Sequence, residues 1–215
     1  ASSADDKRAV AINTVSANAC TGAQGMANAQ RMSELVAEVI DATPEQVFVM
    51  STGVIGTQLP MTKIEKGVSL AAQSLGDDWQ NAATAIMTTD TRPKLASITV
   101  ETAQGSYTIA GISKGSGMIA PNMATMLGVV VTDAKLSSAM AQQALSSTAD
   151  SSFNRIIVDG DTSTNDMVIL LANGESDIAI EDESYEQFQK ALNQVMTSLS
   201  KQIVRDGEGV SKFIS

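Results

Sequence analysis

The chain has 215 residues, of which 43% are hydrophobic and 18% are charged, and its formal net charge is -10. This composition is typical of a folded globular protein, and the length suffices for one substantial core. The acidic balance argues against nucleic acids and anionic membranes as partners, because both bind clustered positive charge. No apolar run approaches the roughly 18 residues that span a bilayer. We expect a single domain over residues 1–215, or two tightly joined halves, that acts on small molecules in the cytoplasm, or in an organelle matrix after loss of a presequence.

The sequence contains one cysteine and no histidine. A single cysteine, Cys20, excludes an internal disulfide and a thiolate metal cluster, and we expect it to be a small buried apolar side chain. The absence of histidine removes the commonest partner for activating a serine or cysteine nucleophile. Hydrolase or transferase chemistry would then need another base. A threonine whose own α-amino group serves as the base is one of the few remaining ways to activate a nucleophile.

The first third of the chain alternates between strand and helix patterns. Residues 8–14 alternate as in a strand, apolar side chains recur at helical spacing up to residue 40, and residues 47–50 form an apolar strand. Thr43, with proline after it, predicts the start of a short helical turn. Residues 62–65 form a capping-box pattern and predict a helix to about residue 75.

The middle of the chain predicts a short helix over residues 79–86 and then a hairpin. Its strands are residues 96–100 and 107–110, around the Gln104-Gly105 turn. Residues 127–131 form an apolar, β-branched run, which favours a strand buried on both faces.

The last third predicts two more helices. Ser137 caps a helix to about residue 147, and apolar residues over 185–203 mark one face of a long helix. Residues 156–158 resemble a buried strand, whereas residues 167–172 fit a helix or a strand equally well. The alternation of helices and strands gives an α/β or α+β class.

A glycine-rich segment lies before the central strand. Gly115 and Gly117 permit backbone conformations closed to other residues, and Pro121 biases the residues before it toward an extended path. This loop would deliver Thr125 in a set geometry at the edge of a rigid strand, which is a good place for a nucleophile. A turn that merely precedes a core strand is the ordinary alternative.

The string KGSGMIAPNMATML, residues 114–127, resembles the cleavage segment of the ornithine acetyltransferase family, the bifunctional glutamate N-acetyltransferases of arginine biosynthesis. The resemblance covers nearly the whole chain. Further similar segments are residues 18–22, 51–56, 59–61, 88–91, 159–166 and 206–209.

The resemblance implies a layered sandwich of helices around β-sheets, as in self-processing enzymes with an N-terminal threonine nucleophile. Cleavage between Ala124 and Thr125 would divide the chain into parts of an α chain, 1–124, and a β chain, 125–215. Thr125 would then be the nucleophile.

The resemblance also assigns the other site residues. Thr52 and Gly53 match the pair that forms the oxyanion hole, and Thr88, Lys114 and Glu208 match substrate-binding positions together with Thr125. The ordinary interpretations are a small-residue turn at residues 52–53, a surface lysine at Lys114 and a solvated acid at Glu208.

The acidic segment 159–166 superficially resembles a calcium loop. It lacks the bidentate glutamate at the twelfth position, so we predict no metal there and expect its carboxylates and hydroxyls to brace the active site. Two departures from the family stand out. Residues 13–18 lack a glycine that is usual there, and the Asn and Thr or Ser that complete the family's pocket near its C-terminus are absent, as expected for a fragment lacking both ends.

The leading hypothesis is ping-pong transfer of acetyl from N-acetylornithine to glutamate. The resemblance implies no cofactor, allows acetyl-CoA as a second donor, and implies an α/β heterotetramer for the full-length protein. A self-processing aminopeptidase or amidase would instead use water as the acceptor, and a catalytically silent fragment would fold without a working pocket.

Overall fold

The computed structural model describes residues 6–120 and 126–214. These residues divide into two compact units, one formed by residues 6–78 and the other by the chain from Trp79 onward. Both units combine helices with β-strands, which confirms the mixed α/β class.

The unit of residues 6–78 is built on a pair of parallel strands, β1 and β2. Ala11 of β1 lies opposite Val49 of β2. Helix α1 packs on this pair and on α2, and a small apolar cluster that includes Met32 and Val47 fills the space between them. The elements are β1 (Ala9–Asn13), α1 (Gly22–Ile40), the 3-10 turn η1 (Pro44–Gln46), β2 (Val47–Ser51) and α2 (Met61–Ala72).

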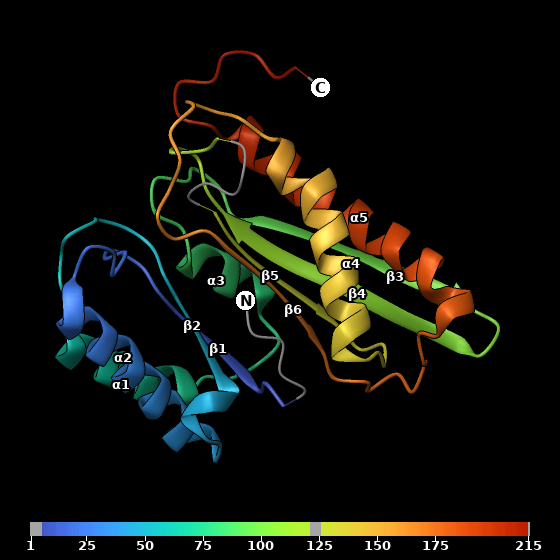
Figure 1. Ribbon diagram of the computed structural model, residues 1–215, viewed down its shortest axis with the longest axis horizontal. Coiled ribbons are helices and arrows are strands. Elements are labelled where there is room, and N and C mark those ends of the chain that lie inside the picture. The colour runs from blue at the N-terminus through green and yellow to red at the C-terminus, as the bar shows by residue number, and fades with distance from the viewer. Residues whose placement is uncertain (1–5, 121–125, 215) are drawn as a thin grey trace. The chain divides into compact units, whose positions relative to one another are not determined.

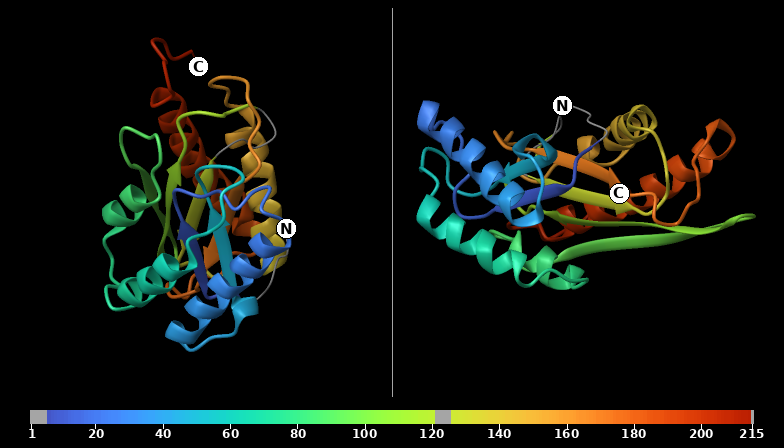
Figure 2. Two further views of the ribbon diagram at one scale, coloured as in Figure 1. Left: turned by 90° about the vertical axis from the view of Figure 1, so that its left-hand side faces the viewer. Right: turned by 90° about the horizontal axis from the view of Figure 1, so that it is seen from below.

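The second unit is built on a four-stranded sheet with the order β3-β4-β5-β6 (Figure 1). The strands are β3 (Lys94–Thr102), β4 (Gly105–Lys114), β5 (Leu127–Thr132) and β6 (Met167–Ala172). Strands β3 and β4 form one long antiparallel hairpin (Figure 2), whereas β5 and β6 run parallel. The pattern over residues 167–172 that fitted helix or strand is therefore a strand.

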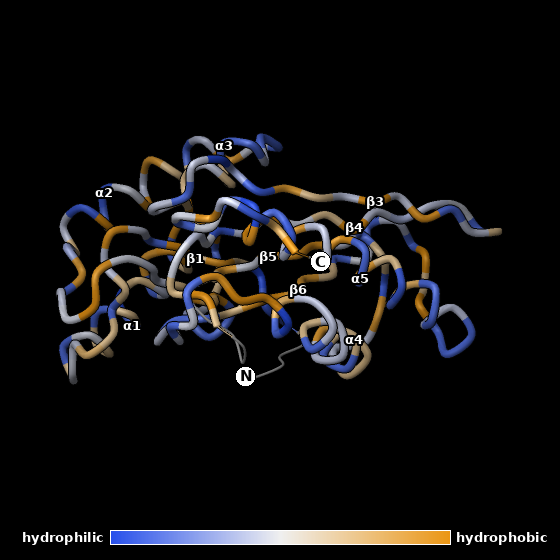
Figure 3. The backbone as a smooth tube through the Cα atoms, turned by 90° about the horizontal axis from the view of Figure 1, so that it is seen from above, coloured by the Kyte–Doolittle hydropathy of each residue, from blue (hydrophilic) through white to orange (hydrophobic). Residues whose placement is uncertain are grey.

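Two long helices cover one face of this sheet, and a short helix contacts the other face (Figure 3). The first two are α4 (Ser138–Ser151) and α5 (Asp182–Arg205), and the short one is α3 (Trp79–Ala85). Ser137 caps α4, because its side chain accepts a hydrogen bond from the Met140 N–H at 3.3 Å. The 3-10 turn η2 (Phe153–Arg155) follows α4.

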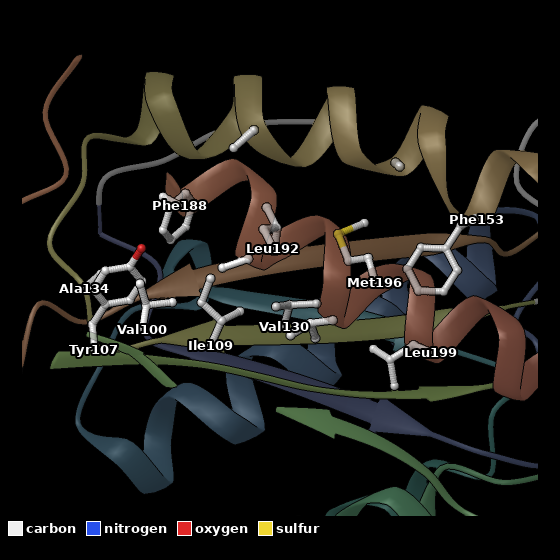
Figure 4. Packing of buried hydrophobic residues seen from close by; sticks show 14 of the residues in the cluster. Val100, Tyr107, Ile109, Val130, Ala134, Phe153, Phe188, Leu192, Met196 and Leu199 are labelled. Atoms are coloured by element: carbon white, nitrogen blue, oxygen red, sulfur yellow. The ribbon is translucent and has the colours of Figure 1, made fainter. Parts of the chain in front are cut away.

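The main core lies between α5 and the sheet. Phe188, Leu192 and Leu199 point from α5 toward Ile109 and Val130 of the sheet (Figure 4), and all five side chains are fully buried. Their spacing along α5 repeats the apolar stripe predicted from the sequence. Val130 belongs to β5, and on the opposite face of this strand Leu127 and Val129 are buried as well. Burial on both faces was predicted for β5.

Three local predictions are wrong. Residues 156–158 form no strand; the Val158 N–H instead donates one backbone hydrogen bond to the Ile119 carbonyl at 2.9 Å. Helix α2 begins after Pro60 without a side-chain cap, so the capping-box pattern at residues 62–65 lies inside the helix. Cys20 is exposed and has a positive φ of 57°, because it lies in the turn before α1 rather than in the core.

The core of α5 provides a test of the packing. Replacing the fully buried Leu192 by alanine should lower the free energy of unfolding by about 2–5 kcal/mol, because methyl groups are lost and a cavity remains. Chemical denaturation measures this loss. Lys190→Ala, on the exposed face of the same helix, should change it by less than about 0.5 kcal/mol. Equal effects of the two changes would contradict the assigned faces.

Candidate active site

The sheet itself places Lys114 next to the segment that enters β5. Lys114 ends β4 and pairs with Leu127, the first residue of β5. The chain then leaves the sheet at Gly115, whose φ of +146° favours glycine. Lys114 is only 1% exposed, so the interpretation as a surface lysine is wrong.

Asp90 joins the segment of Thr88 to this loop. One oxygen of Asp90 accepts a hydrogen bond from the Gly115 N–H at 2.7 Å, and the other accepts one from the Thr88 N–H at 3.1 Å. Next to this contact, the hydroxyl groups of Thr89 and Ser116 lie 2.7 Å apart. The exposed Thr88 is therefore fixed beside the loop that follows Lys114.

Glu208 reaches the same loop from the opposite end of the unit's sequence. Its backbone N–H donates to the Ser116 carbonyl at 2.7 Å. A Cβ atom at Gly117 would lie 2.8 Å from one carboxylate oxygen of Glu208, so the Glu208 side chain lies directly against the loop at this glycine. The structure thus brings together Thr88, Lys114 and Glu208, the three predicted substrate-binding residues that it describes.

The environment of Lys114 combines burial with several charges. Burial lowers the pKa of Lys114 below its ordinary value, while Asp90, Asp166 and Glu208 pull it back up. An ammonium group in such a poorly solvated place interacts strongly with any carboxylate that approaches it.

A second lysine, which sequence reasoning did not single out, lies at the centre of a buried ionic cluster. The Lys94 Nζ atom lies 2.6 Å from Asp90 Oδ1 and 2.6 Å from Asp206 Oδ2, and all three side chains are almost fully buried. Asp206 caps the end of α5 and also accepts hydrogen bonds from the N–H and hydroxyl groups of Thr91. We call Asp90, Lys94 and Asp206 the Lys94 cluster. Nothing in the sequence signals it, because Lys94 and Asp206 are 112 positions apart.

The two carboxylates of the Lys94 cluster remain ionised. Burial alone would raise the pKa of each, but in Asp90 the hydrogen bonds from Lys94, Gly115 and Thr88 outweigh it, and in Asp206 those from Lys94 and Thr91 do so. The pKa of both groups therefore lies below the ordinary value, and their contribution to stability is present above the unfolded-state pKa of about 3.9.

Two aspartates of segment 159–166 hold the backbone on either side of residues 121–125. Asp159 accepts hydrogen bonds from the N–H groups of Met118 and Ile119, the latter at 2.8 Å. Asp166 accepts one from the Met126 N–H at 2.8 Å. Two carboxylates of the segment therefore hold the neighbouring backbone, and their role in bracing an active site stays a prediction. In the described ranges, no group of three or more His, Cys, Asp or Glu side chains could hold a metal ion.

The proposed oxyanion pair lies in the unit of residues 6–78. Thr52 follows β2, is 2% exposed and donates its N–H to the Asn13 carbonyl at 3.1 Å. Gly53 has a φ of +132°, and a Cβ there would lie 2.2 Å from the carbonyl carbon of Val15. Glycine is therefore required at position 53 for a structural reason as well. Ala124 and Thr125 lie outside the described residues, so the assignments of nucleophile and oxyanion hole stay predictions.

Buried charged side chains that converge on a glycine-rich loop are typical of an enzyme site rather than of a packed core. The ArgJ family model matches residues 1–215, and the chain belongs to the ArgJ family. This confirms the resemblance drawn from the sequence motifs.

Relatives with curated names agree with this assignment. The arginine biosynthesis bifunctional protein ArgJ of Symbiobacterium thermophilum is 50% identical over 211 residues, which are 96% of this chain and 52% of the relative. The mitochondrial ArgJ of Heterostelium pallidum is 49% identical over 211 residues, 95% of this chain and 48% of the relative. The chain therefore spans about half the length of the curated relatives it matches.

Two solved structures are also similar in part. The arginine biosynthesis bifunctional protein from Bacillus halodurans is 38% identical with a TM-score of 0.49, over 54% of this chain and 61% of that one. The ornithine acetyltransferase of Mycobacterium tuberculosis, solved in complex with ornithine, is 36% identical with a TM-score of 0.49, over 53% of this chain and 61% of that one.

Among the described residues, no helix is both long and apolar enough to cross a membrane.

The Lys94 cluster can be tested by removing its cation. Lys94→Met should lower the free energy of unfolding at pH 7 by about 3–5 kcal/mol, because two buried carboxylates lose their partner. Denaturation curves at several pH values measure the effect, which should shrink below about pH 4 as the carboxylates gain protons. Lys135→Met, at an exposed lysine, is the matched control. A loss that is equally large at pH 3 and pH 7 would contradict the ionic origin.

Proposed function

We propose that the full-length protein cleaves itself between Ala124 and Thr125 and then transfers acetyl groups from N-acetylornithine to glutamate. Membership of the ArgJ family over residues 1–215 carries this proposal. The convergence of Thr88, Lys114 and Glu208 on one loop supports it, because these residues come from distant parts of the sequence.

Self-cleavage supplies the nucleophile with its base. The Thr125 hydroxyl attacks the Ala124 carbonyl carbon, the peptide bond is exchanged for an ester, and water cleaves the ester. The freed α-amine of Thr125 has an ordinary pKa of about 7.7–8.0, so a substantial part of it is neutral near physiological pH. It can then take the proton of its own hydroxyl group, and histidine is not required.

Acetyl transfer then proceeds in two half-reactions. Thr125 takes the acetyl group from N-acetylornithine and releases ornithine, and glutamate next attacks the acetyl-threonine ester through its amine. The Thr52 hydroxyl and the Gly53 N–H would stabilise the oxyanion of each step. Loss of one such donor costs about 2.7–4 kcal/mol in other enzymes.

Charge complementarity suggests how the amino-acid substrates bind. Lys114 and Glu208 supply one charge of each sign at the same loop. We propose that the Glu208 carboxylate receives the cationic end of ornithine, and that Lys114 favours the substrate carboxylate. Thr88 adds a hydroxyl group at the same edge.

The remaining proposals concern the whole protein. Cleavage leaves residues 1–124 in an α chain and residues 125–215 in a β chain, which assemble as an α/β heterotetramer. We propose no cofactor and allow acetyl-CoA as a second acetyl donor. The cytoplasm is the proposed compartment.

Removing the hydroxyl group of Thr125 tests the nucleophile. The Thr125→Ala variant of the full-length protein should stay a single chain, whereas Thr125→Ser should still cleave, more slowly, because serine keeps the hydroxyl. Intact-mass analysis shows one piece or two, and N-terminal sequencing should find Thr125 at the new end of the unchanged protein. A Thr125→Ala variant that still cleaves at this bond would refute the assignment.

Removing the carboxylate of Glu208 tests substrate selection. A hydrogen bond to a charged group contributes about 1.5–3 kcal/mol, so Glu208→Ala should raise KM for N-acetylornithine by about 10- to 100-fold. Self-cleavage should continue, since Glu208 has no role in it. Steady-state kinetics and intact mass give the two readouts, with Glu175→Ala, at an exposed glutamate, as the control. Loss of cleavage in a folded Glu208→Ala variant would show that the role is misassigned.

A further inference from the structure

Asp90 holds both of the segments that carry the proposed substrate-binding residues Thr88 and Lys114. Its Oδ1 atom accepts the N–H of Gly115, the residue after Lys114, at 2.7 Å, and its Oδ2 atom accepts the N–H of Thr88 at 3.1 Å. Thr88 is exposed, whereas the Asp90 side chain is fully buried and has no surface for a substrate to touch. Any part that Asp90 has in substrate binding therefore acts through these two neighbours.

The Lys94 cluster contains one carboxylate more than its single cation can neutralise. Lys94 lies 2.6 Å from both Asp90 and Asp206, so the three buried side chains carry one positive and two negative charges. Asp206 has a second basic neighbour in Arg92, at 3.8 Å, but Arg92 is more than half exposed and water screens its charge. The second buried cation is Lys114, on which the charge of Asp90 acts. Two lysines and two aspartates together leave the buried group neutral, and a buried charge is costly unless it is compensated.

Lys114 needs a negative charge nearby to stay an ammonium group. It is almost fully buried, and this burial lowers its pKa. The charged groups that act on it come from four places in the fold: Asp90 before β3, Lys94 on β3, Asp166 before β6 and Glu208 after α5. Of the three carboxylates, Asp90 opposes the effect of burial most strongly, whereas the like charge of Lys94 adds to it. Lys114 attracts a substrate carboxylate only while it keeps its proton.

Asp206 offers a comparison within the same cluster. It also binds Lys94, but its other hydrogen bonds come from the N–H and hydroxyl groups of Thr91, which is not a proposed substrate-binding residue. Asp90 and Asp206 thus share one ion pair and differ in the segments that they hold.

Given the proposed function, we propose that Asp90 is a positioning residue for substrate binding, which joins Thr88 and Lys114 into one unit and balances the buried charge of Lys114. Because Lys94 is shared with Asp206, part of the Asp90 charge remains for Lys114. The carboxylate of N-acetylornithine or glutamate then meets a hydroxyl group and an ammonium group that are already oriented. Binding groups that are fixed in advance lose less conformational freedom when a ligand arrives.

The test measures kcat and KM for N-acetylornithine with the cleaved full-length protein from about pH 6 to about pH 9. Asp90→Asn keeps an oxygen for one of the hydrogen bonds but removes the charge. Lys94 and Asp206 remain as a neutral pair, so this variant should fold. KM should rise by about 10- to 100-fold at neutral pH, in the range of a lost hydrogen bond to a charged group. The value of kcat should change by less than about threefold, because Asp90 acts on binding.

The pH dependence separates the charge of Asp90 from its hydrogen bonds. Without this charge the pKa of Lys114 falls further, so Lys114 loses its proton at a lower pH. The ratio of KM in Asp90→Asn to KM in the unchanged protein should therefore be smallest at about pH 6 and increase with pH, by up to about tenfold per pH unit. Asp90→Glu keeps the charge but displaces the carboxylate oxygens. It should raise KM by a factor that does not vary with pH.

Asp206→Asn is the matched control, because it removes the other carboxylate of the same ion pair. It should lower the stability, and the ratio of its KM to that of the unchanged protein should stay constant with pH. Circular dichroism and denaturation curves establish that the variants are folded.

The outcomes separate the two proposals. If the unchanged protein transfers acetyl groups and a folded Asp90→Asn variant has an unaltered KM, or a KM ratio that does not vary with pH, the role of Asp90 is refuted and the acetyltransferase proposal stands. The same pH-dependent increase in Asp206→Asn would also refute it, since the effect would then belong to the whole cluster. If the unchanged full-length protein neither binds N-acetylornithine nor transfers its acetyl group, the proposed function fails and the role of Asp90 fails with it.

Discussion

The buried ammonium of Lys94, shared between Asp90 and Asp206, is the interaction on which the arrangement of the site depends. A buried ion pair gains little net stability when complete, but it is costly to break, because the remaining charges cannot return to water. The three residues come from the segment before β3, from β3 itself and from the end of α5. The Lys94 cluster therefore fixes the positions of these three segments relative to one another. Apolar packing alone would specify these positions less precisely.

The Lys94 cluster also determines the position of the loop after β4. Asp90 also holds the Gly115 N–H, and two residues after Asp206 the backbone of Glu208 binds Ser116. Lys114 precedes Gly115, which binds Asp90, and Glu208 lies two residues after Asp206 and binds Ser116. These contacts bring Lys114 and Glu208 to the same loop. One oxygen serves Lys94 and Gly115 together, so the structural charge and the proposed substrate-binding charges belong to one connected network.

The sequence predicted the elements whose signal is local. The hairpin of β3 and β4, the buried strand β5 and the apolar stripe of α5 follow from periodicity and turn residues, and the structure confirms them. The prediction of a strand at residues 156–158 was wrong, because Ile156 and Val158 pack against the main core cluster while the segment joins no strand ladder. The motifs also indicated Lys114 and Glu208. Lys94 and the burial of Lys114 could not be foreseen, since both depend on contacts between segments far apart in the chain.

In the proposed mechanism, Thr125 carries the acetyl group between the two substrates. The most direct measurement is to incubate the cleaved full-length protein with N-acetylornithine in the absence of glutamate and to analyse the peptide that begins at Thr125 by mass spectrometry. We expect one acetyl group on the Thr125 side chain, which is lost when glutamate is added and recovered as N-acetylglutamate. An unmodified Thr125 peptide, with N-acetylglutamate formed only when both substrates are present together, would contradict it.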